Sequence, residues 1–233
     1  MLKMLCATTA LALFAIPASA ATMKAVYTGT VDYGYDQTGI FGTAGADLSG
    51  LNYVLTYIYD TSKGYRWTGS GYDEIYGGEG YGNESPILSA TLKINGHSTE
   101  FGSDYYGVAY AYSDQSSYTY RYDYSYDYNY DASHSAYDYI YTYAGYNQGS
   151  SGSLDDAVSL TDAFSYGYSY FAKYDYNYSD WSYGTYTYGS LTPTKLVVSS
   201  NDPAAVPLPA SALLLVSGFG GLGALRVLRR RAA

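Results

Sequence analysis

The chain has 233 residues, of which 35 are tyrosine and 26 are glycine, and its formal net charge at pH 7 is −9. This length suffices for one domain with a hydrophobic core, and abundant tyrosine and glycine favour sheets and turns over helices. The acidic charge argues against nucleic acid or anionic lipid as partners. The single cysteine, Cys6, excludes intramolecular disulfides and cysteine-rich metal sites.

The first 20 residues have the parts of a secretory signal peptide. Lys3 precedes an apolar run from Met4 to Ile16, and Ala18-Ser19-Ala20 supplies an A-x-A cleavage site. We therefore expect residues 1–20 to be removed during export. The alternative interpretation of the apolar run is a buried core helix.

Residues 21–200 form the predicted body, and its first half alternates with a period of two. Thr22–Val31 is a predicted strand, and Asp36–Gly50 is a predicted glycine-rich loop. The next predicted strand is Leu51–Asp60. One face of that strand is expected to carry Leu51, Tyr53, Leu55, Tyr57 and Tyr59.

Gly64–Asn83 is rich in turn residues and specifies no clear strand. After it, one face of a predicted strand is lined by Leu88, Ala90, Leu92 and Ile94. Asn95-Gly96 then predicts a type I′ hairpin, because both residues tolerate a positive φ. His97–Phe101 is the expected returning strand.

The second half of the body is dominated by tyrosine. Its predicted strands are Tyr105–Tyr112, Tyr118–Tyr130, Tyr137–Tyr143, Val158–Phe171, Tyr174–Tyr178, Tyr183–Tyr188 and Leu196–Val198. Because no segment from residue 21 to residue 200 keeps a helical period, we predict an all-β body. Many short strands separated by turns favour an antiparallel β-sandwich or a jelly-roll-like fold.

The most regular segment is residues 118–131, which reads YTYRYDYSYDYNYD. A strand places its seven tyrosines in one row and the residues between them on the opposite face. Cross-strand aromatic pairs would stabilise neighbouring rows by roughly 0.2–1 kcal/mol each. The structural interpretation is that the rings pack flat on an opposing sheet with their hydroxyls at the rim, while the polar face is exposed to solvent.

Two functional interpretations compete with that structural one. An exposed row with Tyr122, Tyr124 and Tyr126 at its centre could stack on sugar rings, which would make the body a polysaccharide-binding module. Exposed tyrosine rows could also associate between copies of the chain, or become cross-linked by oxidation in a matrix material.

Metal-binding and catalytic patterns in the body are weak. Asp127, Asn129 and Asp131 match the D-x-N-x-D start of a calcium loop and are candidate Ca²⁺ ligands, but position six is Ala132 rather than glycine. No histidine pair or nucleophile elbow is present. We therefore predict no enzyme activity, no catalytic residues and no cofactor other than possible calcium.

The C-terminal region has three parts in a fixed order. A linker at residues 201–205 leads to Val206, Pro207, Leu208, Pro209 and Ala210. Counted from Val206, the apolar stretch is about 20 residues long, which just suffices for a transmembrane helix. Arg229, Arg230 and Arg231 come next, and such a basic cluster stays on the cytoplasmic side.

This tail resembles the VPLPA-CTERM sorting signal, a variant of the PEP-CTERM class. The resemblance covers residues 206–233 and implies that a membrane-embedded exosortase-type enzyme recognises residues 206–210, with the span and Arg229–Arg231 as a transient anchor. Proteins with such tails are associated with extracellular polysaccharide and biofilm matrix. The alternative interpretations are a permanent membrane anchor and a buried core helix.

Together these patterns predict an exported structural protein of the cell surface or extracellular matrix. The chain would cross the inner membrane, remain anchored there transiently, and then be processed by the exosortase-type enzyme. The alternative function is polysaccharide binding through an exposed tyrosine face. Expected partners are the processing enzyme, an extracellular polysaccharide and further copies of the chain, but not nucleic acid.

Overall fold

The computed structural model describes residues 22–114, 118–130, 134–147, 151–177 and 182–201. These residues form thirteen strands and one short 3-10 helix, η1. The elements in chain order are β1 (Thr22–Asp36), β2 (Ala46–Asp47), β3 (Asn52–Asp60), β4 (Tyr65–Gly69), β5 (Tyr72–Gly77), η1 (Glu79–Tyr81), β6 (Ile87–Ile94), β7 (His97–Phe101), β8 (Tyr106–Ser113), β9 (Thr119–Tyr130), β10 (His134–Tyr146), β11 (Val158–Thr161), β12 (Phe164–Asn177) and β13 (Ser182–Ser200).

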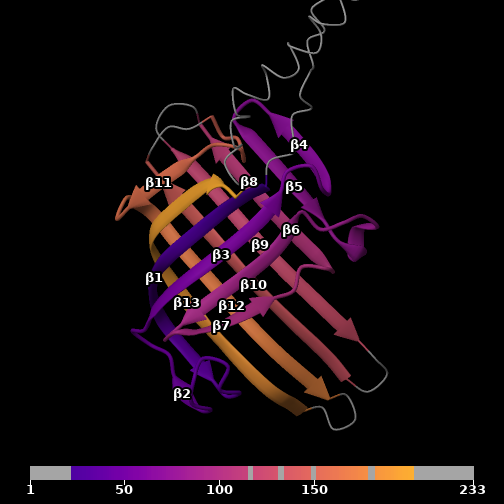
Figure 1. Cartoon of the computed structure of the whole chain (residues 1–233), viewed down its shortest axis with the longest axis vertical. Coiled ribbons are helices and arrows are strands. Elements are labelled where there is room, and N and C mark those ends of the chain that lie inside the picture. Colours follow the sequence, from indigo (N-terminus) through magenta and orange to yellow (C-terminus); the bar gives the residue numbers. More distant parts are fainter. Residues whose placement is uncertain (1–21, 115–117, 131–133, 148–150, 178–181, 202–233) are drawn as a thin grey trace, which may run out of the picture. The chain divides into compact units, whose positions relative to one another are not determined.

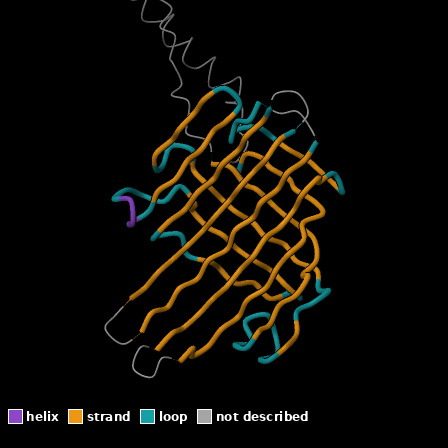
Figure 2. Tube along the Cα trace, turned by 180° about the vertical axis from the view of Figure 1, so that it is seen from behind, coloured by secondary structure: helices purple, strands orange, loops and turns teal. Residues whose placement is uncertain are grey.

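All the strands join into one antiparallel sheet. The order across the sheet is β4-β5-β8-β9-β10-β12-β13-β1-β3-β6-β7, with β2 paired to β1 and β11 paired to β13 beside this path. The sheet curls, so that β1, β3, β6 and β7 lie across β8, β9, β10 and β12 (Figure 1). Figure 2 shows the second group of strands from behind.

The predicted all-β, antiparallel fold is confirmed. The predicted sandwich or jelly roll differs from the structure in one respect, because the two facing layers belong to a single continuous sheet. The long strands β1 and β13 pass from one layer into the other. Their pairing shifts register between Thr28 and Gly29 and again between Val31 and Tyr33, and such bulges bend a strand and increase its twist.

The predicted signal peptide, residues 1–20, and the predicted sorting tail, residues 206–233, lie outside the described residues, as do residues 202–205 of the linker. These assignments stay predictions. In the part of the chain that the structure describes, no helix is both long and apolar enough to span a membrane.

The strands with mixed aliphatic and aromatic residues follow their predicted pattern. Tyr53 and Leu55 of β3 are buried, as are the other residues expected on that face except Leu51, which is partly buried against the core. The hairpin between β6 and β7 has Asn95 at φ 51° and Gly96 at φ 85°, which confirms the type I′ signal. Leu88, however, is 43 % exposed.

A register shift explains the exposure of Leu88. The pairing of β3 with β6 is irregular between Ile58 and Tyr59, so Ile87 rather than Leu88 lies opposite Tyr59. Ile87 is buried in the core in its place. A one-residue shift of this kind moves a side chain to the other face of the sheet.

The strand divisions in the second half of the body differ from prediction in three places. The expected gap between Phe171 and Tyr174 is absent, because β12 is continuous there. Asp162 has φ 51° and divides the expected Val158–Phe171 strand into β11 and β12. The expected break before Leu196 is absent, because β13 runs through Pro193 opposite Gly29 at the first bulge. Proline is tolerated in a strand at such a bulge, where no ladder hydrogen bond is needed.

The structural interpretation of the tyrosine-rich strands, with rings packed on an opposing sheet and the polar face exposed, is wrong. In β9, Arg121, Asp123 and Ser125 are buried between the two layers, with exposed fractions of 2 %, 0 % and 0 %. Tyr122 and Tyr124 are only partly buried and lie on the opposite, outer face of the strand. The polar residues therefore line the core, and the tyrosine rows face outward.

The opposing layer explains this orientation. Tyr27 of β1 and Tyr57 of β3 are fully buried and occupy much of the space between the layers. The small or polar residues of β9, β10 and β12 leave room for these rings, and Asp123 of β9 supplies a hydrogen-bond partner for Tyr27. The Tyr27 hydroxyl donates to Oδ2 of Asp123 at 2.5 Å, which meets the need of a buried phenol for a partner.

Candidate binding face

Outward-facing tyrosines of four adjacent strands form one continuous surface, which we call the tyrosine face. Each member contacts at least one other ring of the set. The members are Tyr106, Tyr110, Tyr120, Tyr122, Tyr124, Tyr126, Tyr128, Tyr137, Tyr139, Tyr141, Tyr143, Tyr168, Tyr170 and Tyr174.

Several successive rings along β9 and β10 are stacked at similar distances. In β9 the ring centroids of Tyr122 and Tyr124 are 6.1 Å apart, and those of Tyr124 and Tyr126 are also 6.1 Å apart. In β10 the corresponding distance between Tyr139 and Tyr141 is 6.4 Å. A planar group inserted between two rings would need about 7–8 Å, twice the optimal separation of carbon atoms. A ligand must therefore lie across the rows rather than between the rings.

Rings of neighbouring strands hold these rows in place. Tyr122 of β9 lies 4.4 Å from Tyr143 of β10, centroid to centroid, and Tyr139 of β10 lies 5.9 Å from Tyr170 of β12. The β9 and β10 rows together form a groove of about 640 Å³. Its lining residues are Tyr122, Tyr124, Tyr126, Tyr137, Tyr139, Tyr141 and Tyr143.

The groove is uncharged although the body is acidic. Burial raises the pKa of the Tyr139 phenol to about 12 and raises the pKa values of Tyr122 and Tyr124 further, with neighbouring phenols as a second cause. These hydroxyls therefore remain protonated at neutral pH and can both donate and accept hydrogen bonds. Charged side chains on the same strands, such as Arg121 and Asp123, lie on the inner face.

The residues predicted from the sequence to contact glycan, Tyr122, Tyr124 and Tyr126, lie side by side in one wall of this groove. The second wall, Tyr137 to Tyr143, was not included in that prediction. The same alternation is visible in its sequence, YDYIYTY. Predicting the second wall requires only the assumption that the intervening turn brings the two segments together as a hairpin.

The remaining predicted site residues are not brought together. Asp127 and Asn129 lie near the end of β9, where Asp127 is partly buried and Asn129 is exposed, and Asp131 is outside the described residues. Among the residues that the structure does describe, no group of three or more His, Cys, Asp or Glu could hold a metal ion. The sorting-motif residues 206–210 and Arg229–Arg231 also lie outside the described part.

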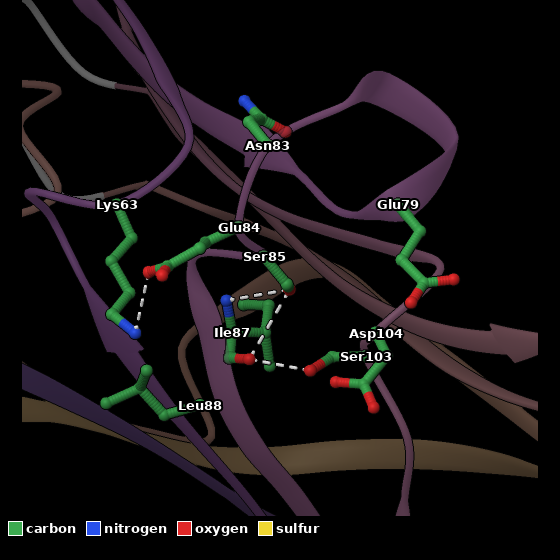
Figure 3. A pocket seen from close by; sticks show the side chains of 9 residues that line it. All are labelled: Lys63, Glu79, Asn83, Glu84, Ser85, Ile87, Leu88, Ser103 and Asp104. Carbon is green, nitrogen blue, oxygen red and sulfur yellow. Dashed lines mark hydrogen bonds and ion pairs between the residues drawn. The ribbon is translucent and has the colours of Figure 1, made fainter.

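A second, polar pocket of about 390 Å³ lies beside η1 (Figure 3). Lys63 and Glu84 form an ion pair there at 3.0 Å, and the Ser103 hydroxyl donates to the Ile87 carbonyl at 2.6 Å. Glu79 and Asp104 also line it. Since Glu84 is 75 % exposed, the ion pair contributes little to stability.

Comparison with protein-family models, curated proteins and solved structures found no match. A fold alone does not identify a function, because functions reside in particular sites. The tyrosine face is therefore the feature from which a function can be inferred.

Proposed function

We propose that the chain is an exported protein of the cell surface or extracellular matrix whose tyrosine face binds extended, uncharged polysaccharide. The observation that supports this proposal is the outward-facing groove between β9 and β10, lined by seven tyrosines and by no charged side chain. Contiguous exposed apolar patches on a protein surface commonly mark binding sites.

The chemistry of the groove matches that of sugars. A tyrosine ring offers an apolar body and a polar tip, and a pyranose ring offers an apolar face of C–H groups and a rim of hydroxyls. A chain of sugars lying across the rows would contact the edges and faces of the tyrosine rings. The phenol hydroxyls would form hydrogen bonds with the hydroxyls of the sugars. Because the body is acidic, with seven Lys/Arg against twenty Asp/Glu in residues 21–200, an anionic polymer would be repelled.

We expect the full-length chain to bind a soluble neutral β-glucan, and the triple variant Tyr122→Ser/Tyr124→Ser/Tyr126→Ser to bind it about tenfold more weakly, which corresponds to about 1.4 kcal/mol. Affinity electrophoresis in gels with and without the glucan measures this change. A carboxymethylated glucan of the same length should bind more weakly to the unmodified chain than the neutral one.

The matched control removes three tyrosines that are exposed outside the groove, Tyr65, Tyr81 and Tyr112. This control triple should retain glucan binding, and circular dichroism should show that both variants remain folded. Undiminished binding by the groove variant, or a lack of glucan binding by the original chain, would rule out this use of the face. Binding lost equally in both triples would indicate a non-specific effect of tyrosine content.

The export part of the proposal rests on the sequence of the two ends. The signal peptide at residues 1–20 and the tail with Val206–Ala210 and Arg229–Arg231 would direct the chain through the inner membrane to an exosortase-type enzyme. We expect the extracellular protein to have an intact mass that lacks both residues 1–20 and the basic C-terminus. Recovery of extracellular protein that still carries Arg229–Arg231 would contradict processing of the tail.

A further inference from the structure

One ring pair at the border of the tyrosine face differs from the others. Tyr81, the last residue of η1, stacks on Tyr106 of β8 with a centroid distance of 4.9 Å and an interplanar angle of 28°. Tyr81 is 50 % exposed. This pair therefore combines a close, nearly parallel arrangement with open access from solvent.

The η1 turn is held against the start of β8 by its backbone. Glu79 N–H donates to the Asp104 carbonyl at 2.7 Å, and Gly80 N–H donates to the Tyr105 carbonyl at 3.2 Å. These bonds fix the position of the turn, whereas Tyr81 itself belongs to no strand ladder. The position of the Tyr81 ring over Tyr106 is thus set by the fold.

Other close pairs lack this combination. The rings of Tyr122 and Tyr143 are only 4.4 Å apart, but both are partly buried, so neither ring has the solvent access of Tyr81. Tyr76, the other neighbour of Tyr81, meets it edge-on at 74°. Neither pair combines a small interplanar angle with a half-exposed ring, as Tyr81 and Tyr106 do.

We propose that Tyr81 and Tyr106 are a site of oxidative cross-linking to dityrosine. The oxidant is hydrogen peroxide used by a peroxidase. Each phenol gives up one hydrogen atom, a new carbon–carbon bond joins an ortho carbon of one ring to an ortho carbon of the other, and the peroxide is reduced to two molecules of water. Both hydroxyls are retained.

Ring contacts lead from the centre of the tyrosine face to this site. The centroid of Tyr141 is 6.4 Å from that of Tyr124, which is 5.6 Å from that of Tyr106. Oxidation of a phenol also releases its proton, and the exposed Tyr81 can pass this proton to water. An oxidising equivalent that reaches the face elsewhere can therefore transfer from ring to ring and react at Tyr81.

The bond would connect the turn that precedes β6 with β8 and close the intervening loop covalently. A cross-link of this kind stabilises a fold chiefly by restricting the unfolded chain. In an extracellular matrix the cross-link would stabilise each copy of the protein without a disulfide.

The test treats the dilute full-length chain with a haem peroxidase and hydrogen peroxide, followed by proteolysis and mass spectrometry. We expect a pair of peptides joined through Tyr81 and Tyr106, with the mass of two hydrogen atoms missing, and a rise in the melting temperature of the treated protein. Tyr81→Phe should abolish this peptide pair and most of the dityrosine fluorescence. Tyr65→Phe, which changes an equally exposed residue, should leave both unchanged.

A parallel reaction in urea shows whether the fold directs the coupling. The Tyr81–Tyr106 product should predominate only in the folded chain and should become one of many products in urea. The proposal is overturned if cross-links in the folded chain join mainly other tyrosines or different molecules, or if Tyr81→Phe leaves the yield of dityrosine unchanged.

Discussion

Replacement of Asp123 by alanine is expected to lower the free energy of unfolding by about 3–5 kcal/mol, because it leaves the buried Arg121 without its counter-ion. Arg121 donates from Nε to Oδ2 of Asp123 at 2.9 Å and from Nη2 to Oδ1 at 3.0 Å. Asp123 also accepts the hydrogen bond of the Tyr27 hydroxyl. All three side chains are buried, so water cannot replace the lost acceptor.

Urea denaturation of the full-length chain measures this loss. The exposed carboxylate Asp47, which accepts hydrogen bonds from Ser49, provides the matched control, and Asp47→Ala should cost no more than about 1 kcal/mol. The double variant Arg121→Met/Asp123→Leu removes both charges and should be more stable than Asp123→Ala alone. An Asp123→Ala variant as stable as the original chain would show that the pair is not required for the fold.

The environment of Arg121 explains why an ion pair can persist in this core. The guanidinium carbon lies 5.0 Å from the centre of the Tyr59 ring, a distance at which a cation is attracted to an aromatic face. The Tyr59 hydroxyl donates in turn to the Leu154 carbonyl at 2.8 Å. Buried tyrosines of β1 and β3 therefore serve as both packing groups and polar partners for β9.

This dual use of tyrosine also limits what the sequence could predict. The alternation in residues 118–130 predicts correctly that the tyrosines share one face and that Arg121 and Asp123 share the other. It does not say which face is buried, because both orientations have the same period. Which face is buried depends on Tyr27 and Tyr57, which belong to distant strands. Their rings already fill the interior, and their hydroxyls need polar partners.

Local sequence signals predict their structures better than signals that depend on distant strands. Asn95-Gly96 has a local turn signal, since both residue types tolerate the positive φ that they adopt here. The hairpin formed by β4 and β5 was missed because it joins the sheet beside β8, far along the chain, and not beside β3, which precedes it. Likewise, the groove forms only where β10 lies next to β9. The row of Tyr122, Tyr124 and Tyr126 supplies only one of its two walls.

The passage of β1 and β13 between the layers depends on a very close backbone approach at Gly29. A Cβ atom at this position would lie 1.9 Å from the Thr192 carbonyl oxygen and 3.0 Å from the Pro193 Cα. Both obstacles are backbone atoms of β13, and they lie at the bulge where Gly29 pairs with Pro193. They cannot move aside without breaking the ladder that connects the two layers.

We therefore expect Gly29→Ala to lower the free energy of unfolding by about 3 kcal/mol, at the upper end of the usual cost of overpacking. Thermal and urea denaturation measure the effect. Gly184→Ala is the matched control on β13, because its nearest neighbour is the mobile end of the Asp175 side chain at 3.3 Å, and a reduced entropy of the unfolded chain partly offsets that contact. If the two alanine variants were equally stable, the close approach at Gly29 would not be what sets the bend, and the bulges alone would have to turn the sheet from one layer to the next.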